Sequence, residues 1–108
     1  MTKEDFMAKQ STLNGKYVQI LSKYFIDSIN RELLNINHLA AFYDIDIHCS
    51  SVDYINDIYR SFNTKMQNDI ILELRRHYDL KGWTCNFTVL RDSDSDRRWI
   101  VCHARFTI

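Results

Sequence analysis

Residues 83–108 read WTCNFTVLRDSDSDRRWIVCHARFTI, and this stretch decides the fold class of the chain. Apolar and polar residues alternate on both sides of the segment DSDSD at residues 92–96. Alternation with a period of two is typical of a half-buried strand, and Asp and Ser are common turn residues. The stretch therefore predicts an antiparallel β-hairpin with a polar turn.

The register of this hairpin depends on which residues share the buried face. Four apolar pairs lie on one face in the register that we expect: Val89–Ile100, Phe87–Cys102, Cys85–Ala104 and Trp83–Phe106. A slip by one residue would place the apolar residues of the last strand opposite Leu90, Thr88, Asn86 and Thr84. Because that slip spoils the match of apolar partners, the first register is favoured.

The same period appears upstream, in the segment AFYDIDIHCS at residues 41–50. Tyr43, Ile45 and Ile47 alternate there with polar residues, which predicts a half-buried strand over residues 42–48. The last strand of the chain is richest in apolar residues, so we expect it at the centre of the sheet. The predicted order is hairpin strand one, hairpin strand two, then strand 42–48.

Helical spacing fills the segments between the strands. Thr2 reads as an N-cap followed by Glu4 and Asp5, and apolar residues then recur with a helical period as far as Leu33. Asn14-Gly15 is a turn signal inside this segment. The apolar spacing keeps its phase across the dipeptide, which favours one bent helix over two and leaves both open.

A second helical segment follows the strand at residues 42–48. Ser50 and Ser51 offer N-caps for it, and Thr64 with Gln67 has the form of a capping box that would divide it in two. Gly82 suits a left-handed C-terminal cap.

These elements predict an α+β fold in the order α-β-α-β-β, with two long helical segments layered on one face of a small antiparallel sheet. A chain of 108 residues has room for one core, and it contains no Pro and no linker composition. We therefore expect a single domain over residues 1–108.

The amino-acid composition indicates the class of protein and the cellular compartment in which we expect it. Hydrophobic residues make up 45% and charged residues 26% of the chain, which is typical of a globular protein. The sequence shows neither a signal-peptide pattern nor an apolar stretch long enough for a membrane span, so we expect no membrane partner and a place in the cytoplasm. Cys49, Cys85 and Cys102 predict buried free thiols, and a zinc site using His48 or His103 is the alternative.

Charge is divided between the two parts of the chain although the formal net charge is zero. Residues 1–74 carry a net charge of −3, and residues 75–108 carry +3. Opposite charges of this kind attract each other within one small domain, and they can also steer a partner. The first interpretation is the more economical, because it requires no ligand.

Three polar residues of strand 42–48 are the candidate metal ligands. Asp44, Asp46 and His48 project to one side of the strand, as carboxylate and imidazole ligands do around a divalent metal. Any strand with one wet face shows the same alternation. In DSDSD the aspartates resemble the start of a calcium loop, but Arg97 and Arg98 stand where the loop would continue, which favours a solvated turn.

Basic residues of the hairpin raise the question of nucleic acid. Arg91, Arg97, Arg98 and Arg105 are interleaved there with Trp99 and His103, as in proteins that bind single strands. An isoelectric point near 6.9 argues against this class. Motifs of hydrolases, zinc proteases and phosphate-binding loops do not occur. We therefore expect neither an enzyme nor a cofactor.

The run ELRRHYDLKGWTCNFTVLRDSDSDRRWIVCHARFTI at residues 73–108 resembles the C-terminal half of many small uncharacterised proteins of tailed bacteriophages. The resemblance covers about residues 68–108, carried by Leu74, Gly82, Trp83 and the alternating strands. The Asn- and Ile-rich composition without Pro is similar to that of proteins encoded by genes from AT-rich phage genomes. The resemblance implies a minor virion component or a modulator of host machinery, in the host cytoplasm or the virion, and it carries over no functional residue.

Two functional hypotheses follow. The first is a non-enzymatic protein-interaction module whose partner is another protein or a second copy, with its working surface on the sheet face opposite the helices. The predicted surface is centred on Trp99 and bordered by Leu90, Val101, His103 and Arg105. The second is a metal-dependent phosphate-handling enzyme using Asp44, Asp46 and His48. Burial of the same sheet face under the N-terminal helix is the alternative that would make Trp99 a core residue.

Overall fold

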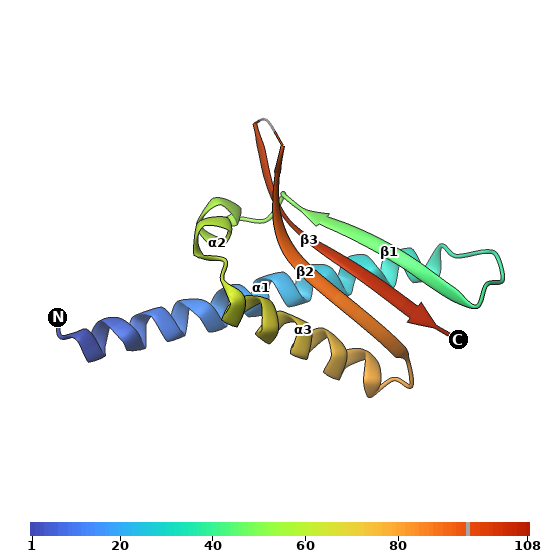
Figure 1. Cartoon of the computed structure of the whole chain (residues 1–108), viewed down its shortest axis with the longest axis horizontal. Helices are drawn as coiled ribbons and strands as arrows, with labels where there is room; N and C mark the ends of the chain where they lie inside the picture. Colours follow the sequence, from blue (N-terminus) through green and yellow to red (C-terminus); the bar gives the residue numbers. More distant parts are fainter. Residues whose placement is uncertain (95) are drawn as a thin grey trace.

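The computed structural model describes residues 1–94 and 96–108 and shows an α+β fold, as predicted (Figure 1). Its elements in chain order are α1 (Lys3–Leu34), β1 (Phe42–Cys49), α2 (Ile55–Ser61), α3 (Thr64–Asp79), β2 (Thr84–Asp94) and β3 (Arg97–Thr107). The strands form one antiparallel sheet in the order β1-β3-β2. The last strand therefore occupies the centre, as its apolar content predicted.

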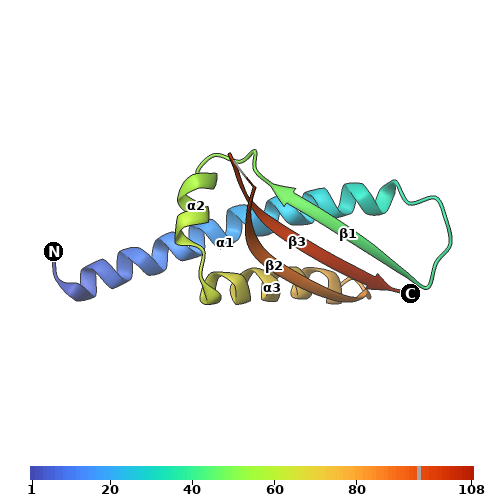
Figure 2. The ribbon, with the colours of Figure 1, turned by 45° about the horizontal axis from the view of Figure 1, so that its top comes forward.

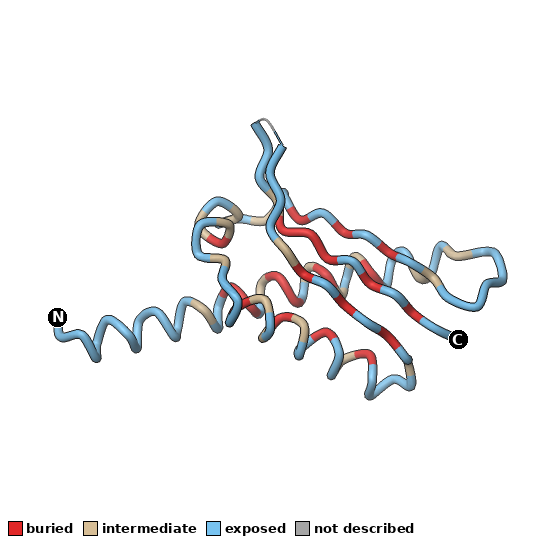
Figure 3. Tube along the Cα trace, viewed as in Figure 1, coloured by how far each residue is buried: buried red, intermediate tan, exposed pale blue. Residues whose placement is uncertain are grey.

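The core lies between the sheet and the helices, which cover one face of the sheet (Figure 2). Buried and exposed residues alternate along β1, along β2 as far as Val89 and along β3 after Cys102 (Figure 3). The strands bury Ile45, Ile47, Cys49, Cys85, Phe87, Val89, Ile100, Cys102, Ala104 and Phe106 on the helix side. Tyr78 of α3 packs edge-to-face on Phe106 at 5.0 Å between ring centroids, and its hydroxyl donates a 2.9 Å hydrogen bond to Asn30 of α1. This tyrosine joins the two long helices to the central strand.

The register of the hairpin differs from the predicted one by two residues. Val89 lies opposite Cys102, Phe87 opposite Ala104 and Cys85 opposite Phe106. A shift of two keeps every side chain on its predicted face, so alternation alone cannot distinguish the two registers. Side-chain volume distinguishes them, because the observed register sets Phe87 and Phe106 opposite the small residues Ala104 and Cys85, whereas the predicted one paired Trp83 with Phe106. Trp83 precedes β2 and packs edge-to-face on Phe106.

The predicted turn DSDSD is shorter than expected. β2 continues through Asp94, which pairs with Arg97 at the start of β3. Asp96 is in a turn, and Ser95 lies outside the described residues. The hairpin consequently extends past the end of β1, because the pairing of β1 with β3 stops at Cys49 and Ile100.

α1 is one continuous helix through Asn14-Gly15, in agreement with the favoured prediction. Its N-terminus has the predicted cap, a capping box in which the Asp5 N–H donates to Thr2 Oγ1 at 3.1 Å. Asn14 is tied to α3, since its Nδ2 donates a 3.1 Å hydrogen bond to Asp69 Oδ2. The dipeptide that signals a turn in the sequence is therefore a point of contact between helices.

The second helical segment is divided in two, and both predicted caps are corrected. α3 is capped by Asn63, whose Oδ1 accepts from the Met66 N–H at 2.9 Å, and Gln67 instead donates to the Val89 carbonyl at 2.6 Å. α2 begins after Tyr54, which has a φ of 70° and no side-chain cap. Ser50 and Ser51 lie too early in the chain to cap it.

Gly82 supplies the left-handed residue that ends α3, as predicted. Its φ is 85°. The Trp83 N–H donates to the Tyr78 carbonyl and the Gly82 N–H donates to the Asp79 carbonyl, each at 3.1 Å. This pair of hydrogen bonds is the Schellman arrangement, which turns the chain directly from the helix into β2.

The molecule is elongated because α1 extends beyond the other elements (Figure 1). Its dimensions are 56 × 35 × 19 Å. The radius of gyration of the Cα atoms is 15.3 Å, against about 13 Å for a compact domain of this length. The projecting part is named the α1 arm and comprises residues 3–16, in which every side chain is exposed except the half-buried Asn14 (Figure 3).

Candidate functional site

The sheet face opposite the helices is open, so the N-terminal helix does not cover it. Its polar residues form pairs between β1 and β3. Arg105 Nε and Nη2 donate to Asp44 Oδ1 and Oδ2 at 2.8 and 3.0 Å. These hydrogen bonds hold the pKa of Asp44 below its ordinary value and raise the pKa of Arg105. Arg105 also lies over the ring of Phe42, with 4.1 Å from its Cζ to the ring centroid.

The next pair along the face joins Asp46 to His103, with 2.5 Å between Oδ1 and Nδ1. His48 then packs edge-to-face with Trp99 at 5.7 Å between ring centroids. The three candidate metal ligands do share one face, as predicted, but each contacts a partner from β3. Alternate residues of a strand lie about 6.5 to 7 Å apart, whereas ligands of one ion must converge within a few ångströms.

The guanidinium group beside Asp44 further disfavours a cation at this position. Across residues 1–94 and 96–108, no three His, Cys, Asp or Glu side chains are grouped as metal ligands. The arrangement favours a structural role, in which the pairs hold the two strands together.

The predicted apolar surface on the same face is smaller than expected. Val101 is only 1% exposed, so this residue cannot contact a partner as predicted. Its cross-strand neighbours are His48 and Leu90, and the register places Trp99 two positions along on the same side. Leu90 and Trp99 are half-buried, while His103 and Arg105 are exposed and paired. Sequence alternation gives the direction of a side chain but not how far its neighbours lean over it.

The three cysteines are buried and free, as predicted. Burial raises the pKa of Cys49 and of Cys102 to about 12, and it also raises the pKa of Cys85. A thiol must lose its proton to act as a nucleophile or as a zinc ligand. These cysteines consequently behave as small apolar core residues.

A groove that the sequence interpretation missed lies between the α1 arm and the junction of α2 with α3. Its volume is about 660 Å³, and its walls include Phe6, Met7, Leu13, Tyr17 and Met66. Phe6 is 49%, Met7 56% and Leu13 36% exposed. The sequence predicts helical apolar spacing along α1 as far as Leu33, and that spacing does not indicate that the first part of this stripe is exposed. The sequence did contain a signal for this exposure, which is the low density of large apolar residues at the start of α1. Only these three occur between Thr2 and Tyr17.

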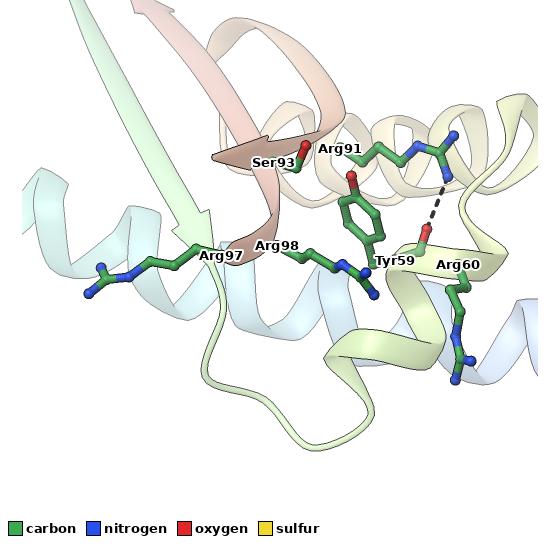
Figure 4. Close-up of a pocket in the computed structure, with 6 residues that line it drawn as sticks. All are labelled: Tyr59, Arg60, Arg91, Ser93, Arg97 and Arg98. Carbon is green, nitrogen blue, oxygen red and sulfur yellow. Dashed lines mark hydrogen bonds between the residues drawn. The ribbon is translucent and has the colours of Figure 1, made fainter. Parts of the chain in front are cut away.

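A second site lies beside Tyr59 of α2 and is lined by Arg60, Arg91, Arg97 and Arg98. In Figure 4, Arg91 and Arg98 lie next to Tyr59, whereas Arg97 points away from it. Arg91 and Arg98 lie over the Tyr59 ring, with 5.4 and 5.7 Å from each Cζ to the ring centroid. Arg91 also donates a 3.3 Å hydrogen bond to the Tyr59 carbonyl. The sequence had placed these two arginines in one group with Arg105. The structure separates them, because Arg105 lies on the open sheet face.

No family model matches the chain, and no similar protein was found among curated proteins or solved structures. Of the described helices, none combines the length and the apolar character needed to cross a lipid bilayer.

Proposed function

We propose that this chain is a protein-interaction module that catalyses no reaction, and that the α1 arm with its apolar groove is its main binding surface. The observation that carries the proposal is the exposure of Phe6, Met7 and Leu13 along one projecting helix. Isolated exposed apolar residues are ordinary, but a contiguous group beside a groove is typical of an interaction site.

The length of the arm supports the same proposal. An α-helix rises 1.5 Å per residue, so the arm is about 21 Å long. Helices of about this length are only marginally stable in water when nothing packs against them. The capping box at Thr2 and Asp5 stabilises the first turn, but the next turns bury no side chain. A partner that covers the arm would bury its apolar residues and stabilise the helix.

The occupant is either another protein or a second copy of the chain. In the arm, Lys3, Lys9 and Lys16 are mixed with Glu4 and Asp5, so neither sign of charge dominates. Docking on this surface therefore depends on apolar contact more than on charge. Helix-in-groove binding, in which apolar side chains of one helix enter a groove of another protein, fits this composition.

We also propose, from the resemblance in residues 68–108, that the module belongs to a tailed bacteriophage. It would then serve as a minor virion component or as a modulator of host machinery, in the host cytoplasm or in the virion. The resemblance of the helix, the Gly-aromatic pair and the hairpin is what supports this proposal. Mass spectrometry of purified virions and of infected-cell lysate would locate the protein.

Charge introduced into the groove tests the proposed surface. Phe6→Glu and Leu13→Glu should each weaken association by about tenfold or more, because they place a carboxylate in an apolar contact. Leu39→Glu is the matched control, since Leu39 is fully exposed in the loop after α1. Sedimentation equilibrium measures self-association, and affinity capture from lysate of the native host, followed by titration of the captured protein, measures partner binding.

The melting temperature should stay within a few degrees of wild type in all three variants, because each replaced side chain is at least one-third exposed. A chain that remains monomeric and captures no partner would contradict the proposal. Equal loss of binding in the Leu39→Glu control would show that the arm is not the surface.

A further inference from the structure

The overhang of the hairpin, residues 91–94 and 97–99, separates its charges onto two sides. Strand geometry directs successive side chains to opposite faces, and directly paired residues share a face. Arg91 pairs with the buried Ile100, so it lies on the helix side, and the pair Ser93–Arg98 follows it there. On the other side lie the pairs Asp92–Trp99 and Asp94–Arg97. One face of the overhang is therefore basic and carries Arg91 and Arg98. The opposite face carries both aspartates, Asp92 and Asp94.

The basic face meets α2 at Tyr59 and borders a shallow, open space of about 500 Å³ (Figure 4). Arg91 and Arg98 reach the Tyr59 ring from the hairpin, whereas Arg60 extends from α2 and pairs with Asp57 at 2.6 Å. Within the described part of the chain, neither Arg91 nor Arg98 forms an ion pair with a carboxylate. Two guanidinium groups therefore contact one aromatic ring, and neither is paired with a carboxylate of the described residues.

We infer that this site, the Tyr59–arginine site, binds an acidic segment of a partner protein through its Asp or Glu carboxylates. Guanidinium groups bind carboxylates with two parallel N–H···O bonds, and these charge-assisted bonds are stronger than neutral ones. Tyr and Arg are also among the residues that dominate binding energy at protein interfaces. The inference rests on the proposed function only in that the ligand is a protein, since the site is separate from the α1 arm and differs from it in chemistry.

The same geometry argues against nucleic acid as the ligand. Single-strand binders stack bases on free aromatic faces. Here the Tyr59 ring already carries the guanidinium groups of Arg91 and Arg98. An extended phosphate backbone would also pass Asp57 on α2, whose carboxylate repels it. A short acidic peptide needs only the basic face.

Fluorescence anisotropy with a labelled peptide of alternating Glu and Ser tests the inference on the full chain. We expect salt-sensitive binding that Arg91→Gln or Arg98→Gln weakens by about tenfold, because each variant removes one charge-assisted contact. Arg98→Lys keeps the positive charge but loses the two parallel N–H donors of the guanidinium group. Its affinity for the peptide should fall between those of wild type and Arg98→Gln. Arg31→Gln is the matched control, since Arg31 is an exposed arginine in the last turn of α1.

Two further measurements distinguish this inference from binding at the α1 arm and from binding of nucleic acid. Phe6→Glu should leave peptide binding unchanged, so that failure of the α1 arm proposal and failure of this one are read independently. A labelled oligothymidylate should bind more weakly than the peptide. Tighter binding of the oligothymidylate, loss of peptide binding in Arg31→Gln equal to that in Arg91→Gln, or binding of neither probe would overturn the inference.

Discussion

The two glycines of the chain have opposite conformational roles. Gly15 lies inside α1, and a Cβ there would meet no atom within 4 Å. Gly82 has the same free space but a φ of 85°, a conformation that costs an L-residue about 1–2 kcal/mol. Free space is therefore equal at the two positions, and only the backbone conformation differs.

We predict that Gly15→Ala raises the free energy of unfolding by about 0.5–1 kcal/mol, because Ala loses less backbone entropy in a helix. Gly82→Ala should lower it by about 1 kcal/mol, since nothing but backbone strain changes. Urea denaturation of both variants measures the two effects. Destabilisation by Gly15→Ala would indicate that α1 is interrupted at this position in solution.

At the scale of elements, Asp69 contributes a polar contact between α1 and α3. Lys65 donates to its Oδ2 at 2.8 Å from the same helix, and Asn14 donates at 3.1 Å from α1. The hydrogen bond from Lys65, followed by that from Asn14, holds the pKa of Asp69 below its ordinary value of 3.8. A carboxyl group with a lowered pKa in the folded state stabilises the fold above its ordinary pKa, and this contribution is lost as pH falls through the lowered value.

We therefore expect Asp69→Asn to be less stable than wild type near neutral pH, with a difference that shrinks as the pH falls below 3.8. Thermal unfolding followed by circular dichroism across this range measures the difference. Asp27→Asn serves as the control, because Asp27 pairs with Lys23 within α1 alone. A difference between wild type and Asp69→Asn that stays constant through the acid range would contradict the assigned role.

The elements also show what sequence patterns can and cannot determine. Period-two alternation correctly assigned the face of Ile100, Cys102 and Phe87, and the capping signal at Thr2 correctly placed the start of α1. The register escaped prediction by two residues because packing volume, not polarity, decides between registers of the same parity. The cap at Asn63 was missed since Thr64 and Gln67 offered an equally good local pattern, and only the tertiary bond from Gln67 to Val89 excluded it.

The candidate sites were predictable to different degrees, because some depend on local sequence patterns and others on tertiary contacts. The polar face with Asp44, Asp46 and His103 follows directly from strand alternation. The Tyr59–arginine site does not, because it joins α2 to a hairpin more than thirty residues away in the chain. Such a contact depends on the relative placement of layers, which no local pattern contains.

For the whole molecule, the division of α1 into a packed part and a projecting arm predicts a division in stability. Amide hydrogens of residues 7–16 should exchange with solvent faster than those of residues 17–34, because the arm buries no side chain and Asn14 forms a single hydrogen bond to α3. Hydrogen-exchange mass spectrometry measures both segments in one experiment. Addition of a partner captured by the chain should slow exchange in the arm, and uniform slow exchange along α1 in the free monomer would contradict this division.

Each strand carries one of the three buried thiols, Cys49 in β1, Cys85 in β2 and Cys102 in β3. A thiolate attacks an alkylating reagent much faster than a thiol does, so burial that keeps these groups protonated also keeps them inert. A strand that detaches from the core exposes its own cysteine and becomes labelled. The wild-type chain thus contains one chemical reporter for each strand. Peptide mapping after brief alkylation would give the order in which the strands detach from the sheet.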